Sequence, residues 1–198
     1  MSRPNPLFAA LLVAFALGGC GSDPDSPEPG QRPVESVDLL APLPPGWKAH
    51  VNSGGGFAFA LPPGWDAQNR GSSTLVRSYD QLAVVSISAD RTREALELPL
   101  EAFATRALAA RPGYEEALRP SEPRELQHRY ASVVVEAQGT AKGSGVAQQV
   151  ELVVLRRSKL VTLTVVIAVN ASPEGEPSEL IAERMVETLR SRPTGGGV

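Results

Sequence analysis

The sequence contains few of the residues from which metal and redox sites are built. Among its 198 residues there is one cysteine, Cys20, and there are two histidines, His50 and His128. A single cysteine cannot form a disulfide within the chain, and a metal site needs several converging ligands. The two histidines lie far apart in the sequence without an acidic cluster at ligand spacing, so we interpret them as partly exposed strand residues. The sequence therefore predicts neither a metal site nor a cofactor.

Recognisable catalytic motifs are missing too. The segment Gly143-Ser144-Gly145 lacks the Gly-x-Ser-x-Gly spacing of a serine hydrolase. Lys142 precedes these glycines, whereas the lysine of a phosphate-binding loop follows them. The carboxylates, including Glu115 and Glu116, are scattered without a pattern that indicates a glycosidase pair. We predict no catalytic residues from the sequence.

Neither a basic surface nor a membrane-spanning run is indicated. The formal net charge is −3, whereas a nucleic-acid partner calls for a basic face, so we expect no nucleic acid as partner. The apolar run Leu7–Leu17 has eleven residues, and a helix needs roughly 20 to cross a bilayer. This run is typical of an export signal rather than of a permanent span.

The first residues have the three parts of such a signal. Arg3 gives a positive start, the run Leu7–Leu17 follows, and Gly18 and Gly19 are small residues before Cys20. The segment Leu17-Gly18-Gly19-Cys20 resembles the lipobox of bacterial lipoproteins. That resemblance implies cleavage between Gly19 and Cys20 and lipid attachment to the Cys20 sulfur.

Two or three acyl chains hold a protein stably on a bilayer. The resemblance therefore implies an extracytoplasmic protein on the cell membrane or the outer membrane. The alternative is an ordinary secretory signal that leaves Cys20 as a free thiol.

The composition divides the chain into a leader, a tether, one domain and a tail. We assign residues 1–19 to the signal peptide and residues 20–45 to a disordered tether. Seven prolines fall between Pro24 and Pro45, and proline stiffens a chain toward an extended conformation. Residues 46–193 form the predicted folded domain, a normal size for one core, and residues 194–198 a flexible tail.

The sequence of the domain predicts short strands, with one helix between the first strands and the later ones. Alternation and turn residues predict the strands, and Lys142–Gly145 is expected to be a loop. We expect the last strand to be central because both of its faces are apolar. The predicted strands cover residues 47–51, 57–61, 74–79, 82–89, 124–130, 132–138, 146–156 and 160–169.

Two amphipathic helices complete the prediction. The first carries Leu100, Phe103 and Leu108 on one stripe, begins after Pro99 and stops at Pro112-Gly113. The second runs from about 177 to 190. Its expected buried stripe consists of Leu180, Ile181, Met185, Val186 and Leu189. Strands, a helix, more strands and a last helix predict an α+β fold, an antiparallel β-sheet with two packed helices.

The segment from Gly56 to Trp65, Gly-Phe-Ala-Phe-Ala-Leu-Pro-Pro-Gly-Trp, resembles the opening strand and turn of PsbP-like domains. That family includes bacterial lipoproteins of the LpqN type. The order of the later elements is also similar, and the resemblance covers residues 46–193. It implies an antiparallel sheet with packed helices and a family that acts mainly by binding proteins or apolar small molecules. No catalytic residues are carried over with it.

Three hypotheses for function follow. We favour a non-catalytic, membrane-anchored module that binds a protein partner in the cell envelope. The first alternative is a carrier of a lipid or other apolar ligand, which needs a cavity of several hundred Å³. The second is an envelope enzyme, which needs clustered polar groups with shifted pKa values in a cleft.

Overall fold

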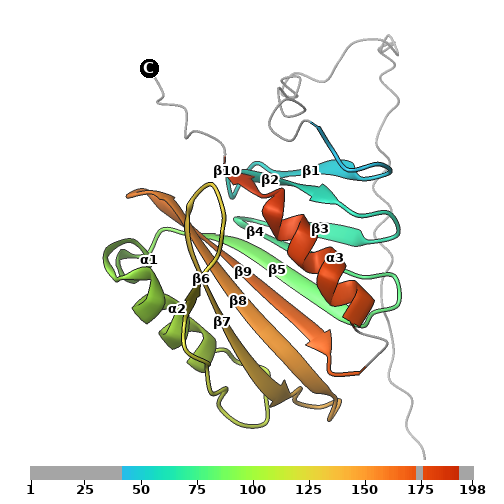
Figure 1. Cartoon of the computed structure of the whole chain (residues 1–198), viewed down its shortest axis with the longest axis vertical. Helices are drawn as coiled ribbons and strands as arrows, with labels where there is room; N and C mark the ends of the chain where they lie inside the picture. The colour runs from blue at the N-terminus through green and yellow to red at the C-terminus, as the bar shows by residue number, and fades with distance from the viewer. Residues whose placement is uncertain (1–41, 173–175, 192–198) are drawn as a thin grey trace, which may run out of the picture. The chain divides into compact units, whose positions relative to one another are not determined.

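The computed structural model describes residues 42–172 and 176–191, without the side chains of residues 157, 158 and 176. Its main feature is a seven-stranded antiparallel sheet, and a three-stranded antiparallel sheet accompanies it (Figure 1). In spatial order the large sheet contains β3 (Asp66–Arg70), β4 (Ser73–Arg77), β5 (Ala83–Asp90), β9 (Val161–Asn170), β8 (Ala147–Ser158), β7 (Ala131–Thr140) and β6 (Arg124–Glu125). The small sheet contains β1 (Lys48–Asn52), β2 (Phe57–Leu61) and β10 (Arg190–Ser191).

Helices cover both faces of the large sheet, as Figure 1 shows. On one face, α1 (Arg93–Glu97) contacts β9, and α2 (Leu100–Ala109) contacts β7 and β8. On the other face, α3 (Glu176–Glu187) contacts β9, β5 and the small-sheet strand β2. The described domain is therefore layered, with the large sheet in the middle.

Two separate hydrophobic clusters fill the spaces between these layers. The first cluster joins α3 and β2 to the large sheet and includes Phe59, Ile167 and Met185, each at most 2% exposed. The second cluster lies under α1 and α2 and includes Phe103, Leu108 and Leu152. Because the large sheet has apolar side chains on both faces, it forms the centre of the hydrophobic core.

Strand β9 supplies side chains to both clusters and is the fourth of seven strands, as expected from its sequence. Val165 and Ile167 face the first cluster, whereas Val166 faces the second. The alternation follows from the two-residue period of a strand. Its pairing with β8 continues over nearly the whole strand, from Gln148↔Asn170 to Ser158↔Val161.

The turn at Pro62-Pro63-Gly64 also forms as predicted. The Trp65 backbone N–H donates to the Pro62 carbonyl at 3.3 Å, and Gly64 has a φ of +77°, a left-handed conformation that glycine adopts without strain. Trp65 is half-buried against the first cluster.

The fold class is confirmed, and the sequence prediction missed three short elements. Strand β3 has the sequence Asp-Ala-Gln-Asn-Arg and is mostly exposed, so it carries no apolar alternation. Helix α1 is only five residues long and begins at the N-cap Thr92, whose side chain accepts from the Ala95 N–H. Strand β10 is two residues long and pairs with β2.

Two predicted boundaries were wrong. The strand expected over 124–130 ends at Glu125, because the chain then turns so that Leu126 and Tyr130 pack against the first cluster. The last helix ends at Glu187 rather than at residue 190. The hydroxyl of Thr188 donates to the Met185 carbonyl and accepts from the Ala60 N–H of β2, which ties the helix end to the small sheet.

Two residues of the predicted stripe on the last helix are not buried, because Ile181 is half-buried and Leu180 is exposed. Leu180 is 62% exposed, whereas Met185, Val186 and Leu189 are at most 3% exposed. In the described part of the chain, no helix is both long and apolar enough to cross a bilayer.

Candidate functional site

A pocket of about 200 Å³ lies between α3 and the segment that follows β6, above strand β8. Three carboxylates, one guanidinium and one imidazole lie on its wall beside aliphatic side chains. The lining residues are Arg124, Leu126, Gln127, His128, Glu151, Val153, Glu183, Val186 and Glu187.

Glu151 is the most deeply placed carboxylate in this pocket. Its side chain is 12% exposed, and it lies on the same face of β8 as the core residues Val153 and Leu155. Burial, with the nearby charge of Glu183, raises the pKa of Glu151 to about 7, although the Arg124 guanidinium opposes the shift. Near neutral pH this carboxyl group is therefore divided between its two protonation states.

The one guanidinium in the pocket is mainly engaged elsewhere. Arg124 Nη2 lies 2.6 Å from Glu136 Oε1 on β7 and 3.7 Å from Glu151 Oε2 on β8. The hydrogen bond to Glu136 is also the first cause of the raised pKa of Arg124. Since Arg124 pairs primarily with Glu136, it compensates the charge of Glu151 only in part.

His128 contributes a donor without an acceptor. The Tyr130 backbone N–H donates to His128 Nδ1 at 3.2 Å, so the proton of the neutral ring lies on Nε2. That Nε2 atom is buried and has no hydrogen-bond partner. Burial and the nearby Arg190 and Arg129 lower the pKa of His128, which favours the neutral ring.

A second pocket, of about 400 Å³, lies beside the end of β7 and the start of β8, next to the turn that connects them. Its wall is made mainly of polar and small side chains. The lining residues are Glu115, Glu116, Ala117, Arg119, Gln138, Gly139, Thr140, Ala147, Gln148 and Ala171. Gly139 has no room for a side chain here, because an added Cβ would lie 2.5 Å from Leu118 Cδ2.

Among the residues considered from the sequence, His128 lines the first pocket, and Glu115 and Glu116 line the second. Gly19 and Cys20 lie outside the described residues. His50 lies in β1, as expected, and its Nε2 is 2.9 Å from Asn69 Oδ1. His128 was expected in a strand, and this was wrong, because it lies in the connection between β6 and β7. Among the described residues, no group of three or more potential metal ligands comes together.

The first pocket could hardly be predicted from the sequence. Glu151 occupies an inward position in β8, but in the sequence it resembles the solvent-facing residue of a half-buried strand. The pairing of β7 with β8 places Glu136 directly opposite Glu151, and two carboxylates facing each other across a strand pair are a detectable signal once the hairpin register is known.

The sheets and helices form an α+β domain whose fold is similar to that of Mog1. The Ran-binding protein Mog1p of Saccharomyces cerevisiae matches over 73% of this chain and 95% of its own, with 10% identity and a TM-score of 0.50. Cyanobacterial PsbP (CyanoP) from Synechocystis sp. matches over 74% of this chain and 92% of its own, with 11% identity and a TM-score of 0.47.

LpqN of Mycobacterium tuberculosis, described as involved in cell envelope biogenesis, matches over 77% of this chain and 82% of its own, with 13% identity and a TM-score of 0.40. At 10% identity the likeness to Mog1p shows the fold alone. No protein-family model matches the chain, and no curated protein sequence matches it significantly.

Proposed function

We propose that this protein is a cell-envelope lipoprotein, anchored through acyl chains on Cys20, whose α+β domain binds a protein partner. The anchor rests on the sequence Leu17-Gly18-Gly19-Cys20 after an eleven-residue apolar run. Residues 20–45 would serve as the tether, and the module would act on the extracytoplasmic side of the cell membrane or the outer membrane.

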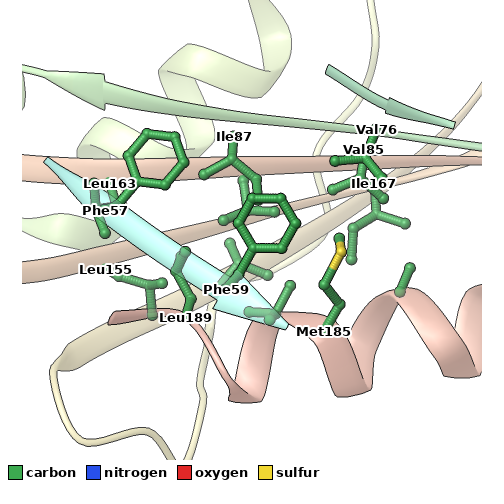
Figure 2. Close-up of a cluster of buried hydrophobic side chains, with 14 of the residues drawn as sticks. Phe57, Phe59, Val76, Val85, Ile87, Leu155, Leu163, Ile167, Met185 and Leu189 are labelled. Carbon is green, nitrogen blue, oxygen red and sulfur yellow. The ribbon is translucent and has the colours of Figure 1, made fainter. Parts of the chain in front are cut away.

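The observation that supports binding at the surface is the filled space between α3 and the sheets. Figure 2 shows Met185 and Leu189 in the same layer as Phe59 of β2 and Ile87 of β5. All four side chains are at most 1% exposed. A carrier would need a cavity of several hundred Å³ for its apolar ligand, and these side chains already fill the space between helix and sheet.

The two pockets described above also favour a surface role. Both are lined in large part by polar groups, whereas small-molecule sites are lined predominantly by hydrophobic and aromatic side chains. The pocket of about 200 Å³ is smaller than the roughly 300–1,000 Å³ typical of drug-sized ligands. It suits one inserted side chain better than a lipid.

One observation favours an enzyme as a second candidate. Glu151 in its pocket, with a pKa raised to about 7, would suit a general acid or base. The pocket wall, as far as the structure describes it, contains no serine, threonine, cysteine or lysine nucleophile beside that carboxyl group. We therefore place binding ahead of catalysis.

Site-specific photo-crosslinking in living cells tests the proposal. A benzoylphenylalanine replaces Gln127 at the rim of the first pocket, and the same residue replaces Gln68 on β3 as a control. Both positions are exposed. We expect one discrete protein adduct from position 127 that is absent from position 68.

We also expect that adduct to be lost when Cys20→Ser removes the anchor. A lipid adduct in place of a protein would support the carrier. No discrete adduct at either position would contradict the binding module.

A further inference from the structure

The pocket beside α3 holds more negative charge than its cation compensates. Glu151, Glu183 and Glu187 are on its wall, and Glu136 and Glu179 also lie near enough to Glu151 to affect it. Arg124 is the cation on that wall. Among the described residues, neither Glu183 nor Glu187 forms an ion pair, whereas Arg124 is held at 2.6 Å by Glu136.

Aliphatic side chains lie beside these charges. Leu126, Val153 and Val186 line the same pocket, and Val153 and Val186 belong to the first hydrophobic cluster. A ligand group that matches this wall has a hydrocarbon stem and a cationic end. Lysine and arginine side chains have this form, and they bury their stems along apolar surface while the charged end meets carboxylates.

His128 gives an independent indication that the wall is incomplete. Its Nε2–H is buried without an acceptor, and an unmade hydrogen bond of this kind is unfavourable. A lysine or arginine side chain has no acceptor to offer, but the peptide backbone that carries it has carbonyl oxygens. The histidine therefore points to a ligand that is part of a polypeptide rather than a free cation.

We propose that this pocket receives a lysine or arginine side chain of the protein partner, whose cationic end pairs with Glu151 and Glu183. The inference rests on the proposed function and names the chemistry of its partner. An exposed basic segment on another envelope protein would meet the requirement. Gln127 at the rim and Glu187 on the last turn of α3 would contact the residues that flank the inserted side chain.

The test uses a small probe and does not need the partner. The protein, purified from membranes in detergent and labelled with ¹⁵N, is titrated at pH 8 with N-acetyl-arginine amide. The neutral isostere N-acetyl-citrulline amide is titrated in parallel. We expect the arginine probe to shift the backbone amide signals of Glu151 and Glu183 saturably. At the same concentration, the citrulline probe should shift these signals at least tenfold less.

A matched pair of variants separates the pocket from general surface charge. E151Q/E183Q removes two carboxylates from the pocket, and E115Q/E116Q removes two from the other pocket. We expect E151Q/E183Q to lower the affinity of the protein for the arginine probe at least tenfold. E115Q/E116Q should change that affinity less than twofold. Because the probe needs the ionised form of Glu151, we also expect weaker binding at pH 6 than at pH 8.

Three results would overturn the inference. They are equal shifts by both probes, equal weakening by both double variants, and tighter saturable binding of Ca²⁺ than of the arginine probe at the same residues. Failure of the inference and failure of the proposed function are distinguishable. Probe binding without any crosslinked partner would count against the function alone, and a crosslinked partner without probe binding would count against the pocket alone.

Discussion

Replacing Glu151 by glutamine should change how the stability of the domain depends on pH. The pKa of this carboxyl is raised from 4.5 to about 7, first because it is buried and then because Glu183 lies nearby. Below pH 4.5 the group is protonated in both the folded and the unfolded chain. Between pH 4.5 and 7 the unfolded chain loses the proton first, so the folded state becomes less stable as the pH rises.

The size of the effect follows from that interval. Each pH unit between the two pKa values corresponds to about 1.4 kcal/mol, so Glu151 costs the folded state about 3 kcal/mol above pH 7. Glutamine has nearly the same shape and does not ionise. The free energy of unfolding of Glu151→Gln, relative to the parent protein, should therefore rise by about 3 kcal/mol between pH 4 and pH 8.

Urea unfolding followed by circular dichroism at a series of pH values measures this difference. Glu116→Gln is the control for the change in net charge, because Glu116 is exposed. The contributions of the other carboxyl groups to the pH dependence largely cancel between the variant and the parent. The exceptions are Glu183, Glu136 and Glu179, because the substitution also removes their repulsion of the Glu151 charge. If the stability curves of Glu151→Gln and the parent stay parallel from pH 4 to pH 8, Glu151 is not buried as described.

Two further pairs of substitutions test the burial of α3 and the connection between the two sheets. Met185→Ala removes a side chain with no exposed surface from α3 and should lower the free energy of unfolding by about 2–5 kcal/mol. Leu180 lies on the same helix but is 62% exposed, so Leu180→Ala should change the free energy of unfolding by less than about 0.5 kcal/mol. Equal effects of the two substitutions would refute the burial of Met185. Asn52 is 1% exposed and joins β1 to β4 through hydrogen bonds to Ser73 O and Thr74 Oγ1, while its Oδ1 accepts from the Gly55 N–H. Asn52→Ala should lower the free energy of unfolding by about 2–3 kcal/mol and speed hydrogen exchange of the Gly55 amide proton. Asn69 is exposed, so Asn69→Ala should lower the free energy of unfolding by about 1 kcal/mol. Unchanged exchange at Gly55 in Asn52→Ala would contradict the hydrogen bond between these residues.

The long elements could be predicted from the sequence because their apolar residues follow one period. Val161, Leu163 and Val165 alternate with Thr162 and Thr164, so β9 is recognisable, and its apolar flanks place it centrally. Phe103 and Leu108 mark the buried side of α2 in the same way.

The short elements could not be predicted because long-range contacts, rather than local pattern, stabilise them. Strand β10 has two residues and depends on Phe57 and Ala58 of β2 as its partners. The end of α3 depends on the Ala60 N–H, which is 128 residues away in the sequence from Thr188. Neither interaction leaves a sign in the local sequence.

The candidate pocket was missed for the same reason. Arg124, Glu151 and Glu183 come from three separate parts of the chain, and only the strand order and the position of α3 bring them together. The residues proposed to carry the anchor, Gly19 and Cys20, belong instead to a contiguous motif that can be recognised from the sequence, and they lie outside the described residues.

The most direct test of the account is the intact mass of the protein extracted from the membranes of its host. We expect a chain that begins at Cys20 and carries a diacylglyceryl group on its sulfur, and we expect no such species from Cys20→Ser. An uncleaved chain with an unmodified Cys20 in the soluble fraction would contradict both the anchor and the envelope role.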